Sequence, residues 1–185
     1  MKHFLKTASA AAVLLASFSA SAADIKPSVV FDMGGKFDKS FNEGVYNGVE
    51  KFKKETGIKY REFEVTNEAQ REQAIRRMAK RGSDIVLGIG FAQSDAVKKV
   101  AGEYPNGQFA IIDGFVIAPN VNAILFKEHE GSFLVGMIAA MKSKTGTVGF
   151  VGGMDIPLIR RFGCGYLQGA KHANSSVKVI QNMTG

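Results

Sequence analysis

Apolar and polar positions change repeatedly between two patterns along the chain. Short runs rich in Val, Ile and Phe are typical of strands, and between them apolar residues recur at helical spacing. The predicted strands cover 28–31, 60–65, 85–90, 109–113, 121–126, 147–151 and 177–180. The predicted helices cover 40–56, 67–81, 94–101, 128–142 and 157–173. This alternation predicts the α/β class, with a doubly wound, mostly parallel sheet that carries helices on both faces.

The first predicted helix has the clearest start signal. Ser40 is followed three residues later by Glu43, which matches a capping box, and Val45, Val49 and Phe52 recur on one face before Gly57 ends the helix. We therefore expect Ser40 to cap this helix and this apolar face to be turned towards the core.

The order of elements also predicts the domain organisation. Residues 23–144 hold the strands and helices of nearly all of a first α/β ligand-binding lobe, whereas 145–185 add only a strand, a helix and a strand. Two strands and one helix cannot bury a core alone. We therefore expect 145–185 to be the incomplete start of a second α/β lobe, in a chain cut short from a longer protein.

Residues 1–22 have the pattern of a secretory signal peptide. Two lysines in the first six residues precede a small apolar stretch at 8–18, and the Ala-Ser-Ala triplet at 20–22 suits a signal peptidase. We expect cleavage after residue 22 or 23 and release into the periplasm. Because no cysteine lies near that point, we expect a protein without a lipid anchor.

Composition and charge exclude several classes of function. With 45% hydrophobic and 22% charged residues, the chain is neither a disordered tract, a collagen-like fibre nor a coiled coil. The net charge is +7, but the basic residues are interspersed with acids, so we expect a solvated face and no nucleic-acid partner. The single cysteine, Cys164, excludes an internal disulfide, and we expect it to be a buried small hydrophobe. Three histidines do not indicate a metal centre.

Candidate ligand-binding residues follow the predicted strands. In open α/β sheets, ligands bind in the crevice outside the carboxyl ends of the strands. Asp32 and Asp113 end two strands and can accept hydrogen bonds from ring N–H groups or sugar hydroxyls. Gly90 ends a third and lets the backbone approach a ligand closely, and 152–155 end a fourth. A single Asp in such a place is equally often a turn former or a helix cap, so the pair carries more weight than either residue.

A polar and aromatic cluster, Asp38-Lys39-Ser40-Phe41-Asn42, leads into the first helix. Capping alone explains Ser40, and a core position is the alternative for Phe41. A ring beside amide and carboxylate groups suits an aromatic base, which needs stacking together with hydrogen bonds at its edge. Gly34-Gly35 fits neither the dinucleotide-binding nor the Walker spacing, so it is weak evidence for a phosphate loop.

Several of these segments resemble the basic membrane protein family, the ligand receptors related to the purine nucleoside receptors of ABC transporters. The resemblance covers residues 26–185 and rests on Asp32-Met-Gly-Gly, Asp38-Lys-Ser-Phe-Asn42, Phe109-Ala-Ile-Ile-Asp113 and Val151-Gly-Gly-Met-Asp-Ile-Pro-Leu158. It implies a type I periplasmic-binding-protein-like fold, in which two lobes joined by a hinge close on a nucleoside-like ligand. It implies ligand contacts from Asp32, Phe41, Asn42, Gly90 and Asp113: Phe41 stacks on the base, the polar groups read its edge or the sugar, and Gly90 offers backbone.

The expected function is therefore that of a periplasmic solute-binding protein that delivers a nucleoside or purine-like ligand to an ABC permease, as a monomer and with no cofactor or metal. We expect no enzymatic activity, because the sequence has no Ser/His/Asp or Cys/His pattern and no supported carboxylate pair. Two alternatives stay open. One is a Rossmann-like enzyme that acts on a nucleotide or sugar, and the other is a ligand-sensing receptor subunit.

The signal-peptide interpretation can be tested directly. The mature chain should begin at Ala23 or Asp24, because the small residues at 20–22 end the leader. Amino-terminal sequencing and intact mass of periplasmic material measure this start. Recovery of chains that begin at Met1, or that carry a lipid, would contradict the expectation.

Overall fold

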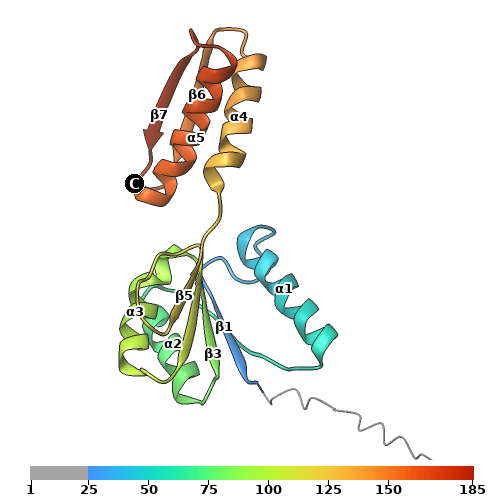
Figure 1. Ribbon diagram of the computed structural model, residues 1–185, viewed down its shortest axis with the longest axis vertical. Coiled ribbons are helices and arrows are strands. Elements are labelled where there is room, and N and C mark those ends of the chain that lie inside the picture. The colour runs from blue at the N-terminus through green and yellow to red at the C-terminus, as the bar shows by residue number, and fades with distance from the viewer. Residues whose placement is uncertain (1–24) are drawn as a thin grey trace, which may run out of the picture.

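The computed structural model describes residues 25–185, so the predicted signal peptide lies outside the described residues. Two units of strands and helices are joined by a linker at 125–127 (Figure 1). The first unit contains β1 (Pro27–Phe31), α1 (Phe41–Thr56), β2 (Arg61–Glu64), α2 (Gln70–Lys80), β3 (Ile85–Ile89), the 3-10 turn η1 (Phe91–Gln93), α3 (Ser94–Glu103), β4 (Gln108–Ile112) and β5 (Val121–Ile124). The second contains α4 (Glu128–Lys142), β6 (Thr147–Gly152), α5 (Pro157–Ala173) and β7 (Lys178–Met183). No helix in residues 25–185 has both the length and the apolar run that a bilayer crossing needs.

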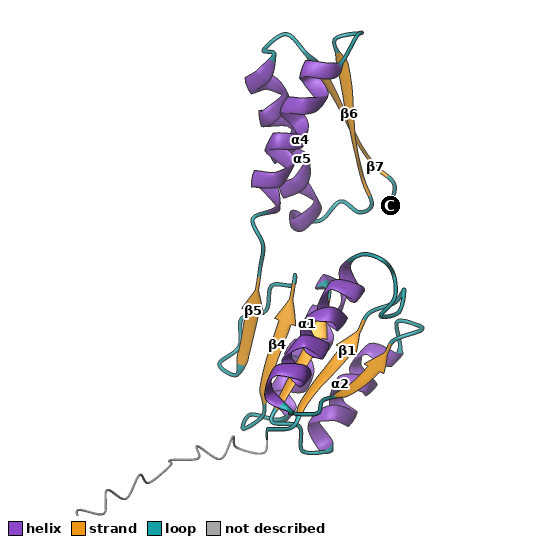
Figure 2. Cartoon of the chain, turned by 90° about the vertical axis from the view of Figure 1, so that its right-hand side faces the viewer, coloured by secondary structure: helices purple, strands orange, loops and turns teal. Residues whose placement is uncertain are grey.

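The first unit is built on five parallel strands in the order β2-β1-β3-β4-β5. Helix α1 covers one face, and α2 and α3 cover the other (Figures 1 and 2). The side chains of β1 alternate accordingly. Val30 belongs to the buried cluster under α2 and α3, whereas Val29 and Phe31 pack with Val45 and Val49 of α1. These two layers confirm the predicted doubly wound, parallel α/β sheet.

The parallel direction gathers the candidate residues at one edge. Strand β5 runs into the linker, so the carboxyl ends of the five strands lie at the edge nearest the second unit (Figure 2). Asp32, Gly90 and Asp113 directly follow β1, β3 and β4 at this edge. We call this edge the carboxyl edge. The fourth predicted strand end, 152–155, follows β6 in the second unit.

The cap of α1 differs from the prediction. Ser40 occupies the N-cap position, but its side chain makes no capping hydrogen bond. The carboxylate of Asp38 caps the helix instead, because it accepts hydrogen bonds from the N–H groups of Ser40 at 2.8 Å, Asn42 at 3.0 Å and Glu43 at 3.1 Å. Glu43 reaches back to the N–H of Lys39 at 2.9 Å. A carboxylate is favoured here because it meets both unpaired donors and the positive end of the helix dipole.

The second unit begins earlier than the predicted boundary between 144 and 145. Helix α4 packs along α5, and Ala140 of α4 shares a buried cluster with Ala170 of α5 and with Val177. Strands β6 and β7 pair in parallel beside these helices (Figure 1). The boundary therefore lies in the linker at 125–127. The sequence predicted α4 itself, but a helical apolar face does not reveal which element will cover it.

Three glycines allow α4 and α5 to approach backbone to backbone. A Cβ atom at Gly136, Gly165 and Gly169 would lie 2.0, 2.3 and 1.8 Å from the carbonyl oxygens of Tyr166, His129 and Phe133, respectively. Rotation of a side chain cannot relieve a clash with backbone. Any larger residue at these positions would therefore force the two helices apart.

Gly169→Ala should destabilise the second unit by about 1–3 kcal/mol, the usual cost of overpacking a close contact. Gly131→Ala in α4 is the matched control, because a Cβ atom there has no neighbour within 4 Å. It should be neutral or stabilising, since Ala favours helix over Gly. Urea unfolding followed by circular dichroism, with amide hydrogen exchange of α4 and α5, measures both changes. Equal stability of the two variants would show that the close helix contact is not required.

Candidate functional site

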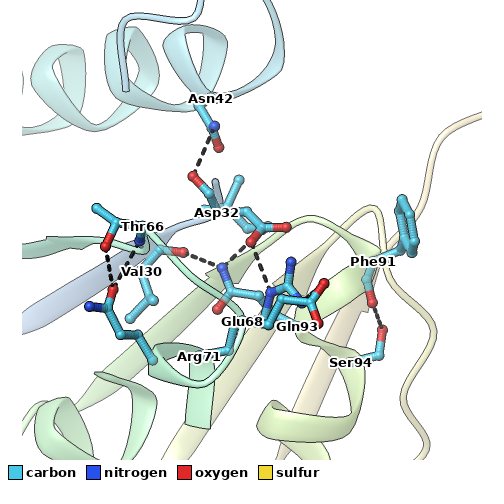
Figure 3. A network of polar contacts seen from close by, with 11 residues as sticks. Val30, Asp32, Asn42, Thr66, Glu68, Arg71, Phe91, Gln93 and Ser94 are labelled. Carbon is cyan, nitrogen blue, oxygen red and sulfur yellow. Dashed lines mark hydrogen bonds and ion pairs between the residues drawn. The ribbon is translucent and has the colours of Figure 1, made fainter. Parts of the chain in front are cut away.

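Asp32 lies at the carboxyl edge with its carboxylate already engaged. Its Oδ1 accepts a hydrogen bond from Nε of Arg71 in α2 at 3.0 Å (Figure 3). Both side chains are mostly buried, with 19% of Asp32 and 14% of Arg71 exposed, so solvent screens this ion pair less than a surface pair. Sequence reasoning missed Arg71, because Gln70-Arg71-Glu72 reads as the solvated face of a helix. The ion pair orients Asp32 and compensates its charge.

Phe41 and Gly90 adjoin this carboxylate. Gly90 is buried and has a φ of +93°, a conformation that glycine adopts without strain. A Cβ atom there would lie 3.5 Å from Oδ2 of Asp32 and 3.8 Å from Cε1 of Phe41. Phe41 is 37% exposed and does not belong to the core clusters of this unit. Three of the predicted residues thus lie together, and they supply an aromatic ring, a carboxylate and glycine backbone.

Asn42 supports the site through the backbone of Asp32. Its side chain is buried, and its Nδ2 donates to the backbone carbonyl of Asp32 at 3.3 Å (Figure 3). Its Oδ1 is also buried and has no hydrogen-bond partner among the described residues. The amide therefore ties the start of α1 to the end of β1. Gln93, which the sequence did not single out, ties β1 to β3 by donating to the carbonyls of Val30 at 2.8 Å and Ile89 at 3.0 Å.

Asp113 lies at the end of β4, two strands from Asp32 along the sheet. Its φ is +60°, a left-handed conformation that Asp tolerates better than most residues, and its N–H donates to the carbonyl of Ile124 at 2.8 Å. Burial raises the pKa of the Asp113 carboxyl, and the negative charge of Glu128 adds to this, whereas Arg161 opposes it. Both of those residues belong to the second unit.

Two charged residues of the second unit, Glu128 and Arg161, affect Asp113. Glu128 opens α4, and its side chain is only 4% exposed. It forms an ion pair with Arg161 of α5, but neither of its carboxylate oxygens makes a hydrogen bond with another described residue. The dipole at the start of α4 favours its negative charge. The sequence did not mark either residue, because their pairing depends on α4 and α5 packing together.

In residues 25–185, no three His, Cys, Asp or Glu side chains gather as ligands for a metal ion. Cys164 was expected to be buried, and this is wrong: it is exposed on α5 and accepts a hydrogen bond from Nε2 of Gln168 at 3.1 Å. The buried face of α5 is formed by 163, 165, 166, 169 and 170, and Cys164 falls on the opposite side.

Comparison with known proteins finds a family match over all the described residues. Residues 25–185 match the Bmp family, described as ABC transporter substrate-binding protein PnrA-like. An ABC transporter nucleoside-binding protein, BmpA, of Lactococcus lactis is 33% identical over 161 residues, which are 84% of this chain and 46% of the relative. An uncharacterised lipoprotein of Pyrococcus horikoshii is 37% identical over 171 residues, which are 87% of this chain and 42% of the relative. The chain thus spans less than half the length of these relatives.

A solved structure is similar in both sequence and fold. The crystal structure of an ABC transporter solute-binding protein from Aeropyrum pernix K1 is 33% identical and has a TM-score of 0.77. The match covers 87% of this chain and 48% of that one.

The raised pKa of Asp113 predicts that its effect on the stability of the fold depends on pH. Because folding raises its pKa above the ordinary value of 3.8, the ionised form costs stability at neutral pH, and this cost disappears where the carboxyl is protonated in both folded and unfolded states. Asp113→Asn, which tolerates the same left-handed backbone, should therefore raise the Tm at pH 7. The gain should shrink as the pH falls and vanish below about pH 4. Thermal unfolding across this range measures it, with Asp95→Asn at an exposed position of α3 as the control. A gain that is independent of pH would contradict the assigned cause.

Proposed function

Because this chain belongs to the Bmp family of PnrA-like ABC transporter substrate-binding proteins, we propose that it binds a nucleoside or purine-like solute and delivers it to the permease of an ABC importer. Solute binding without chemical conversion is the activity of this class. The nucleoside, the permease partner and a monomeric state are parts of the proposal.

The observation that carries the proposal is the convergence of Phe41, Asp32 and Gly90. An accessible ring offers a stacking surface for a base, while a fixed carboxylate can accept hydrogen bonds from ring N–H groups or sugar hydroxyls. Gly90 has no side chain, so its backbone lies close to both groups, where a Cβ atom would contact each of them. The Lactococcus relative, which is named as nucleoside-binding, supports the same class of ligand.

The charges favour an uncharged solute over a phosphorylated one. Arg71 is engaged by Asp32, and Asp113 has no ion pair among the described residues. On this proposal, the phosphate of a nucleotide near Asp113 would be repelled by a carboxylate that has no ion pair of its own. A nucleoside instead offers N–H and O–H donors, which Asp113 can accept.

Binding is proposed to require a second lobe. One sheet edge exposes a bound base to water on its far side, whereas a lobe that closes over it removes that water and strengthens the polar contacts. Residues 25–185 supply the first lobe and the α4-β6-α5-β7 part of the second unit. On this proposal, affinity depends on the rest of a second lobe like that of the longer relatives.

The site of action is proposed to be the periplasm. The predicted signal peptide supports export. The Pyrococcus relative is named a lipoprotein, which conflicts with the expectation of a protein without a lipid anchor, so the proposal covers export and not the mode of attachment.

Phe41→Ala should weaken nucleoside binding by about 1–3 kcal/mol, the scale of an aromatic–base stacking contact. Phe52→Ala is the matched control, because Phe52 lies in the same helix and is also 37% exposed. Titration calorimetry with inosine, guanosine and adenosine measures both, using this chain extended by the remaining second-lobe part of the Lactococcus relative. Residues 24–185 alone should bind weakly or not at all. Tight binding by the short chain would refute the closing-lobe mechanism, and equal losses in the two Phe variants would refute stacking on Phe41.

A further inference from the structure

The segment at 33–40 connects Asp32 to Phe41 and is difficult to hold in one conformation. Gly34, Gly35 and Lys39 all have positive φ, at 108°, 74° and 55°. Glycines lose much conformational freedom when they are fixed, and a non-glycine residue at positive φ adds strain. Asp38 secures the end of the segment nearest α1. Another contact is needed to secure its middle.

Lys36 supplies that contact, on the side of the segment that faces β2. Its backbone N–H donates to Oε2 of Glu64 at 3.0 Å, and its ammonium pairs with Glu62 and, at 3.9 Å, with Glu64. A Cβ atom at Gly35 would lie 3.0 Å from Oε2 of Glu64, so this carboxylate sits directly against the segment's backbone. Both ends of Lys36 are therefore anchored on one edge strand.

Two aromatic rings enclose the same ammonium. The Nζ atom of Lys36 lies 5.5 Å from the ring centroid of Phe37 and 5.3 Å from that of Tyr46 in α1. The two rings pack edge to face, with centroids 5.0 Å apart. Lys36 thus joins the segment to β2 and α1 at once. We call Lys36, Glu62, Glu64, Phe37 and Tyr46 the Lys36 clamp.

The clamp differs from an ordinary surface ion pair. The Lys36 side chain is only 18% exposed, whereas exposed pairs such as Lys51–Glu55, at 74% and 62%, contribute little. Hydrogen bonding to Glu62 raises the pKa of Lys36, with burial opposing it, so the ammonium stays charged through the neutral range. None of its contacts reaches Asp32 or Gly90. Lys36 can therefore act on the site only through the conformation of 33–40.

We propose that Lys36 is a positioning residue for solute binding: by clamping the segment at 33–40 to β2 and α1, it holds Asp32 and Phe41 in their binding arrangement before the ligand arrives. This inference rests on the proposed function where it concerns affinity. Without the clamp, binding must order the segment, and the apparent affinity falls by the fraction of molecules in the ordered state.

The first test needs no ligand. In the 185-residue chain, Lys36→Met should increase amide hydrogen exchange in peptides covering 32–43 by about tenfold, which corresponds to about 1.4 kcal/mol of local opening. Exchange in β3 should not change. Lys36→Arg, which can still pair with Glu62, should restore most of the protection, and Lys51→Met removes the same charge from an exposed pair as the control. Unchanged exchange in 32–43, an equal effect of Lys51→Met, or loss of protection in β3 as well would each overturn the positioning role.

The second test measures affinity. In this chain extended by the remaining part of the Lactococcus relative, Lys36→Met should weaken binding of the best nucleoside about tenfold. Glu62→Gln should weaken it less, because Lys36 keeps its contacts with Glu64, Phe37 and Tyr46. The double variant should be no weaker than Lys36→Met alone, because Glu62 acts through Lys36. Additive losses, or unchanged affinity beside increased exchange, would overturn the link to binding. If no nucleoside binds even the unmodified extended chain, the proposed function fails, while the exchange experiment still decides whether Lys36 orders the segment.

Discussion

Strand β1 is buried on both faces, and the rest of the first unit is arranged by that burial. All five of its residues are buried, it pairs with β2 on one side and β3 on the other, and its alternate side chains meet α1 and the α2–α3 layer. A strand in this position must be largely apolar, and the hydroxyl of Ser28, its one polar side chain, is hydrogen-bonded to Ser83. It must also end where polar groups can reach water or a partner. Asp32 is the first residue past that end. The position of the site is therefore a direct consequence of burying β1.

The site is organised largely by contacts outside it. Asp32 is oriented by Arg71, its carbonyl is held by Asn42, and Asp38 caps the helix that begins with Phe41. Each of these polar groups lies on the rim of a buried sheet, where an unpaired donor or acceptor is costly. The same bonds that satisfy the ends of β1 and α1 therefore fix the groups that would contact a solute. Asp113 contrasts with Asp32, because the charged groups near it come from the second unit.

The second unit is organised by close helix packing. Gly136, Gly165 and Gly169 allow the backbones of α4 and α5 to lie close together. Helix α4 therefore packs on α5, although it directly follows β5 of the first sheet in the chain. Glu128 and Arg161 meet at the end of the α4–α5 pair that adjoins the linker. The charges of Glu128 and Arg161 act on Asp113 across the linker at 125–127. On the proposed closing-lobe mechanism, a rotation about these linker residues would change the distance between the charges.

The sequence alone determined the type and order of the helices and strands, because apolar periodicity and glycine stops are local properties of each element. It also predicted which strand ends carry Asp32, Gly90 and Asp113, since parallel strands place their carboxyl ends at one edge. Only the tertiary structure decided what those elements touch. Arg71, Lys36 and Glu128 look like ordinary charged positions along the chain, and their importance arises from partners 39, 26 and 33 residues away in sequence. For the same reason, Asp38 rather than Ser40 caps α1, and α4 belongs with α5. Periodicity shows that one face of an element must be buried, but the partner that buries it is chosen by packing between elements distant in the sequence.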